Sequence, residues 1–219
     1  MRPTRRHCLL ALLVLQSLVI AGLVWTFRQE LHQKLAARVP CRVLYLGDSI
    51  IAQGGVWSWR LGHWWPHDQN HGSPGFELFQ INATAQEVLP VLRPQTVVVM
   101  GGHNDLARHD LATLTRDYDQ LLTTLRSCAS VERIIVVSTL PDTTGQFADQ
   151  VSGLNDHLVA TCQSDPRLTF LDLRPRLSPE GKLRAEFSRD GVHLNPKGYA
   201  AWAEALRPVV DGDRSRADR

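Results

Sequence analysis

Short apolar runs alternate along the chain with longer stretches in which apolar residues recur every three or four positions. Four runs have the length and the β-branched content that favour strands, at residues 43–46, 96–100, 133–138 and 168–171. The stretches at 111–125, 151–159 and 199–209 place their apolar residues on one helical face. This alternation predicts a parallel sheet covered by helices on both faces.

Polar residues follow the predicted strands. Ligands in such sheets bind beyond the carboxyl ends of the strands, where the connecting loops meet. The first strand runs into GDSI at 47–50, and the strand at 96–100 runs into GGHNDL at 101–106. The segments NHGSPG at 70–75 and SRDGVHLNPKGY at 188–199 belong to loops that we expect at the same edge of the sheet.

These segments contain the parts of a site for acyl transfer through a serine. A serine hydroxyl is a weak nucleophile at neutral pH, so Ser49 needs a base, and His193 can accept its proton. Asp190 lies three residues before His193, close enough to orient the imidazole and to stabilise the imidazolium. Asn104 offers a side-chain amide, and the backbone N–H groups of Gly75 and Ser49 offer two further donors to a tetrahedral oxyanion.

Each of these signals has an ordinary alternative when it stands alone. Ser49 at a strand-to-helix turn is typical of a helix cap, and an Asn-Asp pair after a strand is typical of a turn. An Asp-x-x-His segment is more often a surface pair or a candidate pair of metal ligands. The segments together, in this order and at predicted strand ends, favour the catalytic interpretation.

The combination resembles the SGNH hydrolases, also called the GDSL esterase family, over residues 42–208. GDSI, NHGSPG, GHND and DGVHLNPKGY resemble four of the sequence blocks of that family. The resemblance implies an α/β, flavodoxin-like three-layer α/β/α sandwich with strand order 2-1-3-4-5, and hydrolysis of esters or thioesters without a cofactor or metal. It implies Ser49, His193 and Asp190 as the catalytic triad, and Ser49, Gly75 and Asn104 as the oxyanion hole.

One segment departs from the family pattern. An apolar strand usually precedes the asparagine of the second block, whereas WWPHDQN at 64–70 contains no β-branched residue. An alternative alignment takes FELFQIN at 76–82 as the strand and Asn82 as the asparagine. We favour Asn70, because it leaves room for a helix before the strand at 96–100, as a parallel connection requires. The second strand is then short or irregular.

The amino-terminal residues differ from the rest of the chain. Residues 8–25, CLLALLVLQSLVIAGLVW, contain no charge and are long enough to cross the ~30 Å hydrocarbon core of a bilayer. Arg2, Arg5 and Arg6 precede this run and favour a cytoplasmic amino terminus. A cleaved signal peptide is the alternative, and both interpretations place the catalytic domain in the periplasm or outside the cell. The predicted organisation is a cytoplasmic end and transmembrane signal anchor at 1–27, a stalk at 28–40, an SGNH hydrolase domain at 41–210 and a disordered tail at 211–219.

Composition narrows the picture further. The chain has 219 residues, 43% of them hydrophobic, which suffices for one domain with a full core. A net charge of +2, without a basic stripe interleaved with aromatic residues, argues against nucleic-acid binding. Cys41, Cys128 and Cys162 lie in the part we expect to be exported, and none of them follows a predicted strand. Cys128 and Cys162 end two predicted helices and are our candidates for a disulfide.

Aromatic and histidine residues gather in the segment after the serine. The tryptophans at 57, 59, 64 and 65 either pack in the core or form a platform for a sugar ring or an acyl chain. Trp57, Trp59 and His103 are therefore candidate substrate contacts. Histidines at 63, 67 and 71 have a spacing that suggests a metal, but Pro66 interrupts any shared helical face, and we expect no metal.

We expect a membrane-anchored serine esterase, with a short-acyl or O-acetyl ester of an envelope carbohydrate as the substrate. The segment between Ser49 and Gly75 alternates aromatic with hydrogen-bonding residues and lacks the aliphatic run of a lipid groove. Alternatives are a lysophospholipase- or thioesterase-type lipid esterase and an O-acyltransferase acting on a glycan. A catalytically dead binding module is a further alternative, which the complete set of candidate catalytic residues opposes.

Overall fold

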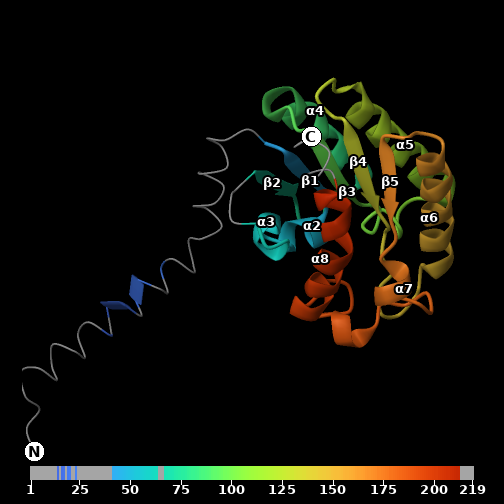
Figure 1. Ribbon diagram of the computed structural model, residues 1–219. Helices are drawn as coiled ribbons and strands as arrows, with labels where there is room; N and C mark the ends of the chain where they lie inside the picture. The colour runs from blue at the N-terminus through green and yellow to red at the C-terminus, as the bar shows by residue number, and fades with distance from the viewer. Residues whose placement is uncertain are drawn as a thin grey trace, which may run out of the picture.

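A central parallel sheet organises the molecule. The computed structural model describes residues 41–63 and 67–212, together with a few residues between 14 and 23. Its five strands lie in the order β2-β1-β3-β4-β5, and every neighbouring pair is parallel (Figure 1). The strands are β1 (Val43–Gly47), β2 (Asp68–Gly72), β3 (Thr96–Met100), β4 (Arg133–Val137) and β5 (Leu168–Leu171). The strand order predicted from the sequence resemblance is therefore confirmed.

Helices cover both faces of the sheet, as the alternating pattern predicted (Figure 1). One face is covered by three long helices, α4 (Leu78–Leu92), α5 (Leu111–Ser127) and α6 (Ala148–Gln163). The other face is covered by α8 (Pro196–Asp211) and by the shorter helices α2 (Ser49–Gln53), α3 (Trp57–Arg60) and α7 (Arg174–Leu177). A 3₁₀ turn, η1 (Ala185–Phe187), precedes α8. The described residues thus form the expected three-layer α/β/α sandwich.

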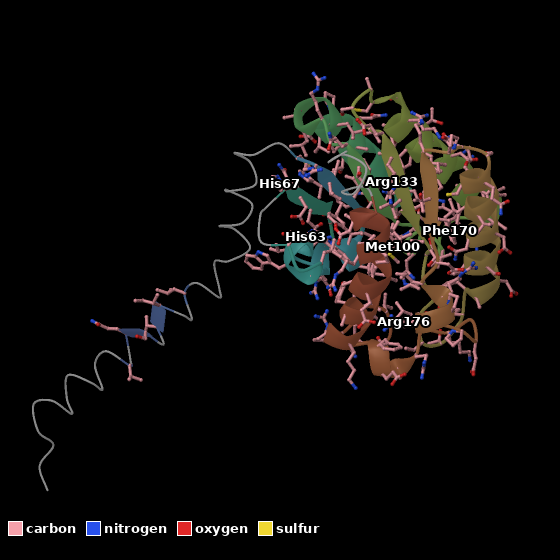
Figure 2. All side chains as sticks on the ribbon, in the orientation of Figure 1. His63, His67, Met100, Arg133, Phe170 and Arg176 are labelled. Carbon is pink, nitrogen blue, oxygen red and sulfur yellow. The ribbon has the colours of Figure 1, made fainter. Side chains whose placement is uncertain are left out.

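Successive residues of the inner strands face two separate cores. In β3, Val97 and Val99 pack with the α4–α6 layer, whereas Val98 and Met100 pack with the α8 layer. All four side chains are fully buried. This explains why the sequence of β3 is one continuous apolar run and not an alternation of apolar and polar residues. Figure 2 labels Met100 close to the α8 ribbon.

The second strand is polar and contains Asn70. Residues 68–72, with the sequence DQNHG, pair in register with β1, so that Asn70 lies opposite Tyr45. The Asn70 amide nitrogen donates to the carbonyl oxygens of Ile51 and Gly55, both at 2.9 Å. The alternative alignment is wrong, because Asn82 lies inside α4. The polar side chains are tolerated because β2 is an edge strand whose residues are mostly half-buried.

Several predictions concern residues outside the described part of the chain. The predicted membrane segment at 8–25 and the stalk at 28–40 lie almost entirely there, as does the tail from residue 213 onward. Among the residues that the structure does describe, no helix has both the length and the apolar character needed to span a bilayer.

The predicted disulfide between Cys128 and Cys162 is wrong. Cys41, Cys128 and Cys162 are all free thiols. The Cys128 sulfur lies 4.0 Å from the carbonyl oxygen of Leu89 in α4 and 3.3 Å from the Ser130 hydroxyl, so it contacts α4 and its own turn. Burial raises the pKa of Cys41 to about 12 and that of Cys162 to about 11, which keeps both thiols protonated.

Candidate active site

The strand-to-helix turn after β1 exposes the Ser49 hydroxyl to a partner from elsewhere in the chain. Asp48, not Ser49, caps helix α2: its Oδ1 atom accepts from the Ile50 N–H at 2.8 Å. Ser49 is the first helical residue, and its side chain is not consumed by the cap. Gly47 is required here, because a Cβ atom at this position would lie 2.2 Å from the Met100 carbonyl oxygen.

Asp48 lies next to the candidate nucleophile, and the sequence analysis assigned it no role. Its side chain is 1% exposed, and burial raises the pKa of its carboxyl. The Ile50 N–H and the nearby His103 and His193 act in the opposite direction. An acidic residue directly before a short helix is a recognisable cap signal, and the sequence therefore held this information.

Ser49, His193 and Asp190 form a continuous chain of hydrogen-bonded side chains. The His193 Nε2 atom lies 2.9 Å from the Ser49 Oγ atom, and its Nδ1 atom lies 2.8 Å from Asp190 Oδ2. Because a carboxylate only accepts, Nδ1 holds the proton and Nε2 is left to accept the serine proton. Asp190 Oδ1 also accepts from the His193 backbone N–H at 2.8 Å. These hydrogen bonds hold the pKa of Asp190 well below its usual range.

Helix α8 fixes His193 relative to Ser49. Asn195 caps the helix by accepting from the backbone N–H groups of Lys197 and Gly198. The Tyr199 hydroxyl, one turn into the helix, donates to the Ile50 carbonyl oxygen at 2.7 Å. The helix that follows the histidine is thus bonded directly to the helix that contains the serine.

Two further loops reach this edge of the sheet. We call residues 73–77, between β2 and α4, the glycine turn, and residues 101–110, between β3 and α5, the asparagine loop. Pro74 and Gly75 form the centre of the glycine turn, with φ +77° at Gly75, a conformation that favours glycine. The Phe76 N–H closes the turn on the Ser73 carbonyl oxygen at 3.4 Å.

Asn104 joins the asparagine loop to the glycine turn. Its amide nitrogen donates to the Phe76 carbonyl oxygen at 2.8 Å. An amide has two N–H donors, so the second remains for another acceptor. Within the described part of the chain, the Gly75 N–H donates no hydrogen bond. Gly75 and Asn104, two of the three predicted oxyanion residues, therefore lie in two loops that are bonded to each other.

The candidate substrate contacts have different locations. Trp57 is fully buried, stacked on Tyr45 at 5.0 Å between ring centroids and edge-on to Trp202 at 4.6 Å. The prediction that Trp57 contacts substrate is wrong, because it is a core residue. Trp59, two positions along, is 46% exposed. The His103 Nδ1 atom lies 3.1 Å from the Leu140 carbonyl oxygen, which positions this half-buried ring beside the β4 loop.

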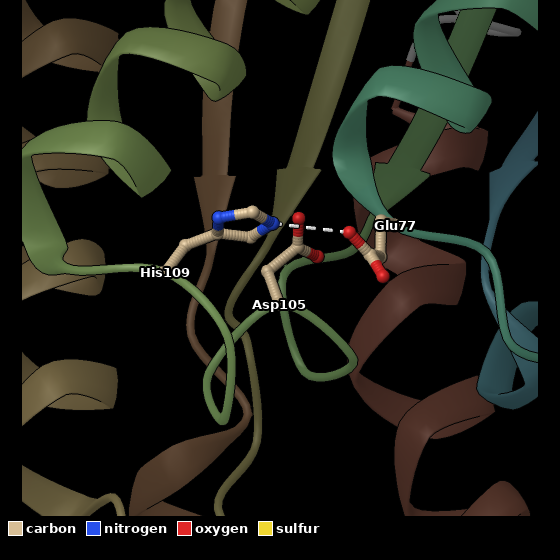
Figure 3. Close-up of side chains that lie close together, drawn as sticks. All are labelled: Glu77, Asp105 and His109. Atoms are coloured by element: carbon tan, nitrogen blue, oxygen red, sulfur yellow. Dashed lines mark hydrogen bonds and ion pairs between the residues drawn. The ribbon is translucent and has the colours of Figure 1, made fainter.

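A second cluster of charged side chains lies where the asparagine loop meets Glu77, the residue that precedes α4 (Figure 3). Glu77, Asp105 and His109 bring potential ligand atoms within 4.8 Å of one another. Their oxygen atoms already have donors, since Glu77 accepts from Arg108 at 2.6 Å and from His109 at 3.1 Å. Asp105 accepts from the Leu78 N–H. We interpret the cluster as an ion-pair network rather than a metal site.

The spaced histidines do not approach one another as metal ligands would. His63 pairs with Asp211 at 2.9 Å, and His71 lies 3.2 Å from the Gln69 side chain. Across the described residues, neither belongs to a group of three potential metal ligands.

The fold and the site define a class of α/β hydrolytic enzymes that present a serine after the first strand of a parallel sheet. Residues 45–201 match the model of the GDSL-like lipase/acylhydrolase family, and the chain belongs to this family. The resemblance predicted from the sequence is thereby confirmed, and the protein is a hydrolase of the GDSL/SGNH type.

Solved structures show the same fold at low sequence identity. A GDSL-like lipase from Bacteroides thetaiotaomicron is 18% identical with a TM-score of 0.67, over 84% of this chain and 97% of that one. A carbohydrate esterase family 3 protein from Talaromyces cellulolyticus is 18% identical with a TM-score of 0.64, over 78% and 96%. An acetyl xylan esterase is 20% identical with a TM-score of 0.60, over 77% and 99%. No curated protein matches the chain.

Proposed function

We propose that this protein is a serine esterase in which Ser49 is the nucleophile, His193 the general base and Asp190 the group that orients the histidine. The observation that supports this proposal most directly is the chain of hydrogen bonds through these three side chains, at 2.9 and 2.8 Å. These distances lie within the range in which a proton passes from a hydroxyl to an imidazole.

The reaction then follows in two halves. Ser49 Oγ attacks the ester carbonyl carbon as His193 Nε2 takes the hydroxyl proton. The tetrahedral intermediate collapses, and His193 returns that proton to the oxygen of the leaving alcohol. Water attacks the acyl-enzyme with His193 again as base, which releases the acid and restores Ser49.

The oxyanion is stabilised by donors from three segments. We assign the backbone N–H groups of Ser49 and Gly75 and the second N–H of the Asn104 amide to this role. Ser49 is the first residue of α2, where backbone N–H groups have no acceptor within the helix. The Gly75 N–H has no acceptor within the described residues either.

The proposed substrate is a short-acyl or O-acetyl ester of an envelope carbohydrate. Polar side chains flank the triad: Arg189 donates to Gln53, four residues after the serine, at 3.0 Å. His103 is held at the same edge of the sheet. These groups suit sugar hydroxyls better than a long alkyl chain. Both carbohydrate esterases and lipases share this fold, so the fold itself permits either substrate.

We further propose that residues 8–25 anchor the enzyme in the cell membrane, with the catalytic domain in the periplasm or outside the cell. The uncharged run and the preceding Arg2, Arg5 and Arg6 support this topology. A reporter fused to the carboxyl terminus should report a location in the periplasm or outside the cell. Reporter activity in the cytoplasm would reverse the topology.

The test of the catalytic proposal is labelling with a fluorophosphonate probe together with ester turnover. The wild-type protein should react covalently at Ser49, and the Ser49→Ala variant should neither be labelled nor hydrolyse p-nitrophenyl acetate. The matched control is Ser58→Ala, which removes the hydroxyl of another buried serine and should leave labelling and turnover unchanged. The backbone N–H of Ser58, which donates to Asp68, is kept in this variant. Labelling of the Ser49→Ala variant at the wild-type level contradicts the assignment. Adding a glycan acceptor to the assay separates hydrolysis from acyl transfer.

A further inference from the structure

The glycine turn and the asparagine loop are held together by more than the Asn104 amide. The Leu78 N–H, the first of helix α4, donates to both carboxylate oxygens of Asp105, at 3.1 and 3.3 Å. Arg108 and His109 of the asparagine loop both pair with Glu77, the last residue of the glycine turn. Figure 3 shows the three titratable side chains of this cluster side by side.

Asp105 is unusual among these groups because its side chain is both charged and buried. It is 2% exposed, directly follows Asn104, and accepts a backbone N–H from the opposite loop. Burial raises its pKa to about 6. The groups that face it are Glu77 at the start of α4, His109 in its own loop and Asp117 in α5; the two acids raise its pKa further, and His109 and the Leu78 N–H lower it.

We propose that Asp105 is a positioning residue for the oxyanion hole, and that its ionised carboxylate holds the glycine turn against Asn104. This inference rests on the proposed esterase function. Asp105 does not touch the substrate. It fixes the first N–H of α4, and so the backbone from Gly75 to Leu78, at a set distance from the Asn104 side chain.

The proposal requires Asp105 to be ionised, because both of its carboxylate oxygens accept from the Leu78 N–H. A carboxylate offers two acceptor oxygens to the Leu78 N–H, whereas a protonated carboxyl offers a donor on one of them. Protonation therefore weakens the contact between the two loops. Oxyanion donors stabilise the transition state only when they sit within a few tenths of an ångström of their productive positions. A loosened turn lowers the rate of the chemical step without changing substrate binding.

The first experiment compares Asp105→Asn with the wild type from pH 5 to pH 8. At pH 8 we expect kcat to fall about 10- to 100-fold with KM unchanged, as for a loss confined to the transition state. The ratio of wild-type to variant activity should then shrink toward one as pH falls below the pKa of Asp105, near 6. Groups that titrate alike in the two proteins cancel in this ratio.

Two neighbouring variants shift this transition in opposite directions. Glu77→Gln removes a negative charge beside Asp105, so the pH at which kcat falls with protonation of Asp105 should move down. His109→Gln removes a positive charge, so the same transition should move up. The control is Asp119→Asn, which removes the carboxylate of another carboxylate–histidine pair, with His157 at 2.8 Å, between α5 and α6. It should leave both activity and its pH profile unchanged.

The outcomes separate this inference from the proposed function. A wild-type protein without turnover or Ser49 labelling defeats both. An active wild type whose ratio to Asp105→Asn stays constant across the pH range defeats the inference alone, because a merely structural residue has no reason to titrate with activity. If Asp105→Asn does not fold, the pH profiles of kcat for the wild type and for the Glu77 and His109 variants decide. Shifts of the two variants in the same direction, or no shift, overturn the proposal.

Discussion

The Nε2 atom of His193 lies 2.9 Å from the Oγ atom of Ser49, although the two residues are 144 positions apart in the chain. Ser49 follows β1 near the middle of the sheet, whereas His193 precedes the last helix. The contact depends on helix α8, which packs over the same face as α2 through Trp202 and the Tyr199 hydrogen bond to Ile50. The hydrophobic core of that layer thus sets the distance between the Ser49 and His193 side chains.

Asp190→Asn should lower kcat by about 10²- to 10⁴-fold, because an asparagine no longer enforces the tautomer that leaves Nε2 free to accept a proton. Stability should change little, since Asp190 is exposed. Steady-state kinetics with p-nitrophenyl acetate and a thermal melt give the two readouts. A variant with normal kcat would show that His193 is oriented by the backbone alone.

Asn104→Ala should lower kcat by about 10²- to 10³-fold, as expected for the loss of one oxyanion donor. Asn104→Asp is the matched variant, because it keeps the size of the side chain but removes both N–H donors. It should be equally slow, and it should also lose the bond to the Phe76 carbonyl oxygen. A loss below threefold in both variants would reduce Asn104 to a turn residue.

Trp57→Ala should lower the free energy of unfolding by about 3–5 kcal/mol, since the fully buried ring packs on Tyr45 and Trp202. Trp59→Ala, at a side chain that is 46% exposed, should cost far less. Chemical denaturation measures both. Comparable losses would contradict the division between a core tryptophan and a surface tryptophan. A rise in KM for an O-acetylated polysaccharide in Trp59→Ala alone would support a substrate contact there.

Trp57, Trp59 and the edge strand β2 are features whose structure could not be predicted from the sequence alone. The inner strands were predictable because their continuous apolar runs have a direct physical cause, burial on both faces. Strand β2 has no such run, since its residues are mostly half-buried and its pairing with β1 uses the backbone. Composition alone did not reveal that Trp57 faces the core and Trp59 does not.

The juxtaposition of the candidate site residues was more predictable than the contacts that support them. Ser49, Asp190, His193 and Asn104 each belong to a short segment beyond a strand end, and topology brings such segments together. The hydrogen-bond partners of Asp105 could not be predicted from the sequence in this way. Its contact with the Leu78 N–H joins positions 27 residues apart through the backbone, and no side-chain pattern encodes that bond.

The free energy of unfolding should show the titration of Asp105. Burial raises its pKa to about 6, whereas an unfolded aspartate titrates near ~3.9. Between these values the folded protein binds more protons than the unfolded chain, so this residue's contribution to stability falls as pH rises. Wild-type Tm minus Asp105→Asn Tm should therefore decrease between about pH 4 and pH 7. A difference that is constant with pH would contradict the buried, titrating carboxyl.

The acyl chain of the substrate provides the last prediction. We expect kcat/KM to fall from acetate to decanoate in a series of p-nitrophenyl esters. Polar side chains lie near the proposed triad: Arg189 is paired to Gln53, and His103 is held at the same edge of the sheet. A decanoyl chain would gain about 0.8 kcal/mol for each buried methylene only where an apolar groove receives it. Trp57, the first tryptophan after the serine, is fully buried and offers no such surface.

The control for this series is Gln53→Leu, which replaces one polar neighbour of the triad with an aliphatic side chain and removes the bond to Arg189. It should raise the relative rate on longer esters while leaving acetate hydrolysis nearly unchanged. If the wild-type kcat/KM instead rises steadily with chain length, the carbohydrate ester is excluded as the preferred substrate. A lysophospholipid or another long-chain ester then takes its place, because only burial of the acyl chain accounts for such a gain.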